Sequence, residues 1–182
     1  MKIRLAADLQ PDSVVDGAGI RTVIWTQGCE HHCIGCHNPE THDINGGAEF
    51  DVEEIFSRID KLENQDGITF SGGDPMMQPK ACCAIAKYAR TKGLNIWCYT
   101  GYTFEKLQEL SKKNIDIAEF LNEIDVLIDG PFILKQRSLS LKFRGSKNQR
   151  IIDLKKTIHE GQIVLVKDNE EISFSRPQGI YI

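Results

Sequence analysis

The stretch RTVIWTQGCEHHCIGCHNPETHD, residues 21–43, joins a short apolar segment to three closely spaced cysteines. Its first six residues are rich in β-branched and aromatic side chains, which predicts a buried strand. Cys29, Cys33 and Cys36 follow at the spacing C-x3-C-x2-C. In parallel α/β sheets, ligands bind at the carboxyl ends of the strands. The stretch therefore predicts a fold class and the position of a site within it.

The overall composition is that of an ordinary globular protein. The chain has 182 residues, of which 41% are hydrophobic and 26% charged, and its formal net charge is -4. This charge gives no reason to expect nucleic-acid binding. No apolar run approaches the roughly 18 residues that a membrane span needs, and the first residues do not resemble a signal peptide. We expect a cytoplasmic protein without a membrane or nucleic-acid partner.

Strands and helices alternate along most of the chain, which predicts parallel βαβ units with right-handed crossovers. Four such strands would form an open sheet or part of a barrel. We expect one domain over residues 1–182, with its core at about 16–150 and an unassigned tail at 151–182. The expected strands are 21–26, 67–71, 95–100 and 123–129, and the expected helices are 51–63, 79–93 and 103–113, with Asp51 and Thr103 as N-caps. In the tail, residues 161–175 suggest two short strands around a turn at 167–170.

Each of the four expected strands is followed by residues suited to a site. The cysteine loop follows the first, SGGDP (71–75) the second, YTGY (99–102) the third and DGPF (129–132) the fourth. Because the carboxyl ends of parallel strands meet at one edge of a sheet, we expect these segments to converge on one rim.

Three cysteines leave a tetrahedral metal site one ligand short. Zinc would need a fourth ligand such as a histidine from the loop. A [4Fe–4S] cluster held by three cysteines would keep one iron open for a substrate, and the glycines beside the cysteines favour wrapping of such a cluster. A redox thiol is a further alternative. The candidate zinc ligands are His31, His32, His37 and His42; we expect His31 and His32 to be solvated loop residues and His37 to line the cluster or its ligand.

The other cysteines, Cys82, Cys83 and Cys98, are not clustered. A disulfide framework is not expected in a reducing compartment. We interpret these three as small buried hydrophobic residues.

GCEHHCIGCHN (28–38) together with SGGDP resembles the radical S-adenosylmethionine superfamily. That superfamily has an aromatic residue after the last cysteine; His37 stands there in this chain, a departure shared by activases of glycyl radical enzymes. The resemblance implies a partial, open parallel (βα) barrel. It also implies that Cys29, Cys33 and Cys36 hold a [4Fe–4S] cluster whose open iron binds S-adenosylmethionine.

The same resemblance suggests which residues contact the cofactors. The glycine-rich turn of the superfamily meets the amino group of the methionine moiety, which assigns Gly72 and Gly73 to that contact. Asp74 would accept from that ammonium group or cap the next helix. Asp129 would reach the ribose hydroxyls, with a turn before Gly130 as the alternative. The full expected cofactor-binding set is Gly35, Cys36, His37, Gly72, Gly73, Asp74 and Asp129.

The leader VVDGAGIR (14–21) resembles the V-D-G-P-G-x-R leader of glycyl radical activases, with Ala18 in place of proline. The match to activators of anaerobic (class III) ribonucleoside-triphosphate reductases runs from about residue 16 to 150. Activators of pyruvate formate-lyase carry a lysine where this chain has Pro131, and they remain an alternative. The resemblance implies an enzyme that takes a hydrogen atom from a glycine of the reductase, with a flavodoxin or ferredoxin as electron donor and no acid–base residue.

The segment RGSKNQR (144–150) is expected near the adenosine or the partner, with a solvated basic loop as the alternative. Two further hypotheses compete with an activase. One is a radical enzyme that acts on a small molecule, which the leader disfavours. The other is a non-catalytic zinc or iron–sulfur module, which would not bind S-adenosylmethionine.

Overall fold

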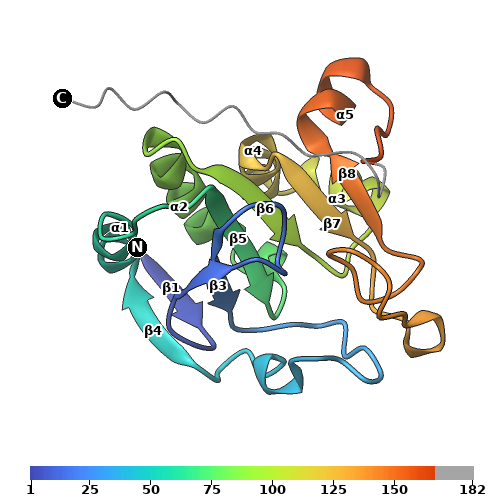
Figure 1. Ribbon diagram of the computed structural model, residues 1–182, viewed down its shortest axis with the longest axis horizontal. Coiled ribbons are helices and arrows are strands. Elements are labelled where there is room, and N and C mark those ends of the chain that lie inside the picture. Colours follow the sequence, from blue (N-terminus) through green and yellow to red (C-terminus); the bar gives the residue numbers. More distant parts are fainter. Residues whose placement is uncertain (167–182) are drawn as a thin grey trace.

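One mixed sheet organises the molecule (Figure 1). The structure is a computed structural model and describes residues 1–166. The strand order is β4-β1-β3-β5-β6-β7-β8, with β2 paired to β3. The strands are β1 Lys2–Leu5, β2 Gln10–Ser13, β3 Arg21–Thr26, β4 Ala48–Asp51, β5 Gly67–Gly72, β6 Asn95–Tyr99, β7 Val126–Asp129 and β8 Arg150–Asp153.

The centre of the sheet is parallel, as the alternation of strands and helices predicts. β3, β5, β6 and β7 run side by side in the same direction. β1, β2 and β8 join this centre antiparallel, and β4 extends β1. Among residues 1–166, the end strands β4 and β8 do not pair with each other, so the sheet stays open. The expected open, partial (βα) barrel is therefore confirmed, with antiparallel edges that the sequence did not indicate.

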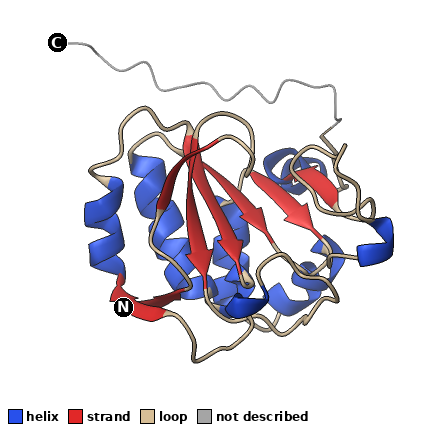
Figure 2. Ribbon diagram, turned by 60° about the horizontal axis from the view of Figure 1, so that its bottom comes forward, coloured by secondary structure: helices blue, strands red, loops and turns tan. Residues whose placement is uncertain are grey.

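Helices cover one face of this sheet, as Figure 2 shows. Thr103 accepts a hydrogen bond from the Lys106 backbone N–H and starts α3 as predicted. Asp51 precedes α1, which ends at Ile59 and is shorter than expected. α4 was not predicted. The helices are α1 Val52–Ile59, α2 Pro79–Thr91, α3 Phe104–Ser111, α4 Ile115–Glu123 and α5 Leu154–Glu160, with short 3-10 turns η1 Pro39–Thr41, η2 Pro75–Met77 and η3 Leu134–Gln136.

Side chains alternate between the two faces of the central strands, as strand geometry requires. Ile24, Phe70 and Cys98 point to the helices and join the main core. Trp97 and Val126 belong to a second buried cluster on the opposite face. The face without helices therefore lines a cavity, and the second buried cluster packs next to that cavity.

The tail is more regular than the sequence suggested. Residues 150–160 form β8 and α5, and β8 extends the sheet beyond the expected core. The first of the two strands expected in 161–175 is reduced to one bridge between Leu165 and Ile152. The turn at 167–170 and the second strand lie outside the described residues.

The arginine of the leader, Arg21, is completely buried on β3. Its guanidinium donates to the Thr69 hydroxyl at 2.7 Å and to the Asn95 side-chain oxygen at 2.7 Å. It also donates to the backbone oxygens of Ala18, Ile68 and Asn95. Burial lowers the pKa of this guanidinium to about 9. Arg21 therefore fastens the leader turn to the amino ends of β5 and β6.

We expect Arg21→Met to lower the free energy of unfolding by about 2–4 kcal/mol, because it leaves several buried acceptors without a donor. Urea denaturation of the metal-free protein measures this loss. Arg58→Met is the control: Arg58 makes a surface ion pair with Asp8, and its replacement should cost less than about 1 kcal/mol. Equal losses in the two variants would contradict the structural role of Arg21.

Candidate functional site

A cavity of about 470 Å³ lies at the carboxyl ends of the four parallel strands. All four segments that follow these strands contribute to its wall, so the predicted convergence on one rim is confirmed. The lining residues are Val15, Asp16, Trp25, Cys29, His31, Cys33, Cys36, His37, Asn38, His42, Ser71, Gly72, Gly73, Tyr99, Thr100, Gly101, Gly130, Phe132, Leu141, Phe143, Arg144, Gly145 and Gln149.

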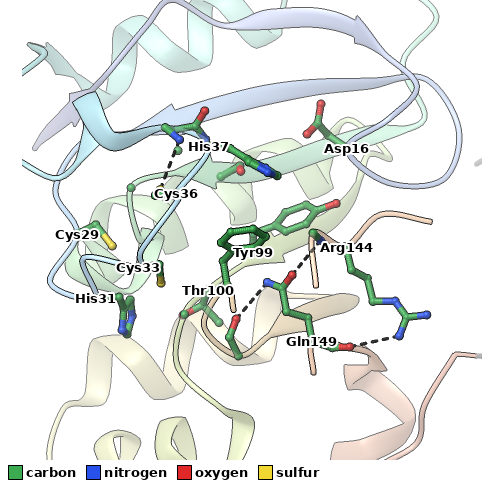
Figure 3. Close-up of a pocket in the computed structure, with 18 of the residues that line it drawn as sticks. Asp16, Cys29, His31, Cys33, Cys36, His37, Tyr99, Thr100, Arg144 and Gln149 are labelled. Carbon is green, nitrogen blue, oxygen red and sulfur yellow. Dashed lines mark hydrogen bonds between the residues drawn. The ribbon is translucent and has the colours of Figure 1, made fainter. Parts of the chain in front are cut away.

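The three cysteines of the loop lie on one side of this cavity, and Tyr99 separates them from Arg144 and Gln149 (Figure 3). All three thiols are free of disulfides and half-buried. The Asn38 backbone N–H points at the Cys36 sulfur, 3.4 Å away. Because all three cysteines line the same space, the loop suits a compact inorganic group better than a core packing role.

The glycine-rich turn is pressed against the start of the cysteine loop. Gly73 N–H donates to the Thr26 oxygen at 2.7 Å, and Asp74 N–H donates to the Gly28 oxygen at 2.8 Å. A Cβ atom at Gly73 would lie 2.3 Å from that Gly28 oxygen, and Gly72 has a φ of +101°. Only glycine fits both positions, so the turn brings its backbone into the cavity wall beside the cysteines.

The Asp74 carboxylate lies at the centre of a network behind that wall, with none of its surface exposed. It accepts from the Thr100 hydroxyl at 2.9 Å and from the Gly101 N–H at 3.0 Å. It also accepts from the Met76 N–H at 2.9 Å and so caps η2. Asp74 thus caps the short η2 turn rather than the predicted helix that begins at Pro79, whose N-cap is Gln78. Asp74 is not itself a lining residue of the cavity.

His31 supplies the remaining donor to Asp74. Its Nε2 lies 2.7 Å from the Asp74 Oδ2, and the hydrogen bond to Asp74 raises the pKa of the imidazole. The ring also packs edge-on against Tyr102, with 4.5 Å between centroids, and fills the space where Gly101 has no side chain. The expectation of a solvated His31 is therefore wrong, because this side chain ties the cysteine loop to β5 and β6. His32 is exposed, as expected.

Cys29 is the cysteine nearest to this network. Burial raises the pKa of its thiol, and the charges of Asp74 and Cys33 raise it further. A metal-bound cysteine must be a thiolate, and the positive charge of bound iron stabilises that form. The half-buried Cys29 sulfur is therefore a neutral thiol unless a cation such as iron binds to it.

Not every predicted residue faces the cavity. Gly35 adopts a φ of +74° within the cysteine loop but, like Asp129, is not among the lining residues. Asp129 is buried, accepts from the Phe104 N–H at 2.7 Å and forms an ion pair with Arg150. Its carboxylate is therefore committed to the start of α3 and to β8.

A second wall of the cavity comes from the segment between β7 and β8, part of which packs against the cysteine loop. Phe132 packs against His37 with 5.0 Å between ring centroids. Gln149 donates to the Gly130 oxygen at 3.1 Å and accepts from the Gly145 N–H at 2.9 Å. Placement of RGSKNQR at the site was one of two sequence interpretations, and its Arg144, Gly145 and Gln149 do line the cavity.

Two further lining residues were given no individual role by the sequence: Asp16 of the leader, and Tyr99 of the YTGY segment that was expected at the rim. Asp16 accepts a hydrogen bond from the Ser13 hydroxyl at 2.5 Å. Burial raises the pKa of the Tyr99 hydroxyl, and the Asp16 charge adds to this rise. The signal for Tyr99 was available, because it shares the strand face of Trp97 and ends its strand at the predicted rim.

Comparison with known proteins identifies the family. A family model described as a 4Fe-4S single cluster domain matches residues 15–152. The anaerobic ribonucleoside-triphosphate reductase-activating protein of Escherichia coli (strain K12) is 34% identical over 154 residues, covering 80% of this chain and 96% of the relative. Proteins of the same name from Haemophilus influenzae and Enterobacteria phage T4 are 37% and 35% identical, covering 78% and 79% of this chain and 92% and 90% of theirs.

The chain belongs to this activating-protein family. Its match to the single-cluster model spans every strand end that forms the cavity. In the described part of the chain, no group of three or more His, Cys, Asp or Glu side chains is arranged to hold a single metal ion. No helix of the described residues is long and apolar enough to cross a membrane.

The His31–Asp74 contact should hold the cysteine loop in place before any cofactor binds. We expect His31→Leu to speed amide hydrogen exchange of residues 29–42 in the metal-free protein by about 5- to 30-fold, because a charge-assisted hydrogen bond worth about 1–2 kcal/mol is lost. His31→Gln, which keeps a donor, should recover part of the protection.

His32→Leu is the matched control in the same loop. His32 is exposed and contacts His42 with 5.0 Å between ring centroids. Its replacement should leave exchange near the wild-type rate. Similar acceleration in both variants would show that the His31–Asp74 contact does not hold the loop.

Proposed function

We propose that this protein activates an anaerobic ribonucleoside-triphosphate reductase by creating a glycyl radical in it. Its cofactors are a single [4Fe–4S] cluster and S-adenosylmethionine. The observation that carries the proposal is the family match over residues 15–152, which contains the whole set of strand ends around the cavity. Held by Cys29, Cys33 and Cys36 and once reduced, the cluster would supply the electron for cleavage of adenosylmethionine, and with it the means of removing a hydrogen atom from the target glycine.

Cys29, Cys33 and Cys36 are proposed as the three ligands of the cluster. Their position on one side of the cavity supports this assignment. The backbone of Gly72 and Gly73 is proposed to meet the amino group of the methionine moiety, since both glycines line the cavity beside the cysteines. His37 and Phe132 pack together and both line the cavity, so we assign them to the part of the wall next to the cluster.

In this scheme the residues of the chain bind, orient and enclose the cluster and adenosylmethionine. No proton transfer is assigned to any of them. Asp74 and His31 hold the cysteine loop at a fixed place relative to the glycine turn. Tyr99 and Thr100 also line the cavity and are proposed to contact the bound adenosylmethionine. We also propose a flavodoxin or ferredoxin as reductant and a cytoplasmic location, because the six free thiols suit a reducing compartment.

The test is anaerobic reconstitution with iron and sulfide, followed by reduction in the presence of adenosylmethionine and the reductase. A [4Fe–4S] electron spin resonance signal that changes with adenosylmethionine, formation of 5′-deoxyadenosine and a glycyl radical on the reductase would support the proposal. Retention of one zinc with no assembly of four irons would refute it. Deoxyadenosine formation without a radical on the reductase would point to a different target.

Cys33→Ala and Cys83→Ala form a matched pair for the ligand assignment. We expect Cys33→Ala to lose the cluster and activation together, since three sulfurs are needed to hold it. Cys83 is buried in α2 within the main core, and its replacement should keep cluster content and activation. Iron and sulfide analysis with visible absorption measures the outcome. An iron-loaded, active Cys33→Ala variant would exclude Cys33 as a ligand.

A further inference from the structure

The segment that links β7 to β8 has an uneven charge composition. Six of the 22 lysines and arginines of the chain lie within residues 135–150. Residues 130–152 contain no aspartate or glutamate, although the chain has 26 acidic residues. We call residues 131–149 the basic arm. Its exposed cations are Lys135, Arg137, Lys142 and Lys147.

These four cations are not neutralised by the fold. Within residues 1–166, none of the four forms an ion pair, whereas other surface cations do: Lys2 pairs with Asp51 at 2.9 Å. In a chain of net charge -4, the arm is thus a local positive surface. A concentration of one sign of charge attracts a ligand of the opposite sign and speeds its association.

Several contacts within the arm connect its two ends and its two sides. The Arg150–Asp129 ion pair closes its base. Arg137 and Ser146 form a bridge across it, and the Lys147 N–H donates to the Gln136 oxygen at 3.0 Å. Cations held on a preformed surface lose less conformational entropy when a partner binds.

The arm stands beside the cavity that it helps to build. Phe132 and Phe143 line the cavity, while Leu134 and Leu139 are 47% and 90% exposed. Leu134 also packs against Gly35 of the cysteine loop. A macromolecule bound to the arm would therefore contact exposed apolar side chains next to the cavity, as well as cations.

From this placement we propose that the basic arm is the docking surface for an acidic segment of the protein substrate. This inference rests on the proposed function, since it concerns how the reductase reaches the same cavity. An acidic segment complements the four unpaired cations, and docking there brings a neighbouring loop of the partner to the cysteine side of the cavity. Rim charges of this kind act mainly on association rate and salt dependence.

The test compares two quadruple variants with the same net charge. The arm variant carries Lys135→Gln, Arg137→Gln, Lys142→Gln and Lys147→Gln. The control variant carries Lys61→Gln, Lys80→Gln, Lys112→Gln and Lys113→Gln, at exposed cations in or beside the helices. Association of each reconstituted protein with the reductase is measured by biolayer interferometry at low and high salt. Glycyl radical yield and reductase-free 5′-deoxyadenosine formation are measured in parallel.

We expect the arm variant to associate with the reductase at least about tenfold more slowly at low salt, with a weaker salt dependence. Its radical yield on limiting reductase should fall, while reductase-free deoxyadenosine formation stays at the wild-type level. The control variant should match the wild type in all three measurements. Equal association rates for the two variants, or loss of reductase-free deoxyadenosine formation in the arm variant, would overturn the proposal.

Two other outcomes separate the docking surface from the function on which it rests. A wild-type protein that cleaves adenosylmethionine but neither binds nor activates the reductase would remove both proposals. A labelled DNA oligonucleotide that binds the wild type but not the arm variant, with reductase binding equal in both, would assign the arm to nucleic acid and overturn the docking proposal alone.

Discussion

The shape of the cavity depends on the hydrogen bonds that the buried carboxylate of Asp74 accepts. A buried charge is costly unless donors surround it, and Asp74 is met by groups from three separate segments. Met76 belongs to its own turn, Thr100 and Gly101 follow β6, and His31 comes from the cysteine loop. Three segments remote in sequence are thereby fixed around one anion, and the cysteine loop takes its position from them.

The central sheet could be predicted because its strands are buried on both faces and read as continuous apolar runs. The edges could not. β2 is QPDS and β4 is AEFD, four-residue strands without an apolar run, and their pairing is decided by neighbours far away in sequence. α4 was missed: the predicted helix ends at residue 113, and no helix was predicted between it and the strand expected from residue 123.

Some residues of the site could likewise be predicted from the sequence, and others could not. The cysteines and the glycine turn could be found because they directly follow predicted strands and consist of residue types with few other uses. His31 and His32 are adjacent residues of the same type, so local pattern could not distinguish them. Only the chain path does so: His32 has a φ of +45°, and His31 reaches a carboxylate 43 residues away. The partners of Asp129, the Phe104 N–H and Arg150, could not be predicted either, because both are remote from it in sequence.

The ion pair between Asp129 and Arg150 spans the base of the segment that separates β7 from β8. Because it holds both ends together, the length and composition of that segment are largely decoupled from the strands beneath it, and added residues cost little closure entropy. Residues added near Ser138 or Ser140 would therefore lengthen this segment without moving β7 or β8. A change at Phe132, Phe143 or Gly145 would instead alter the cavity itself, because these residues form part of its wall.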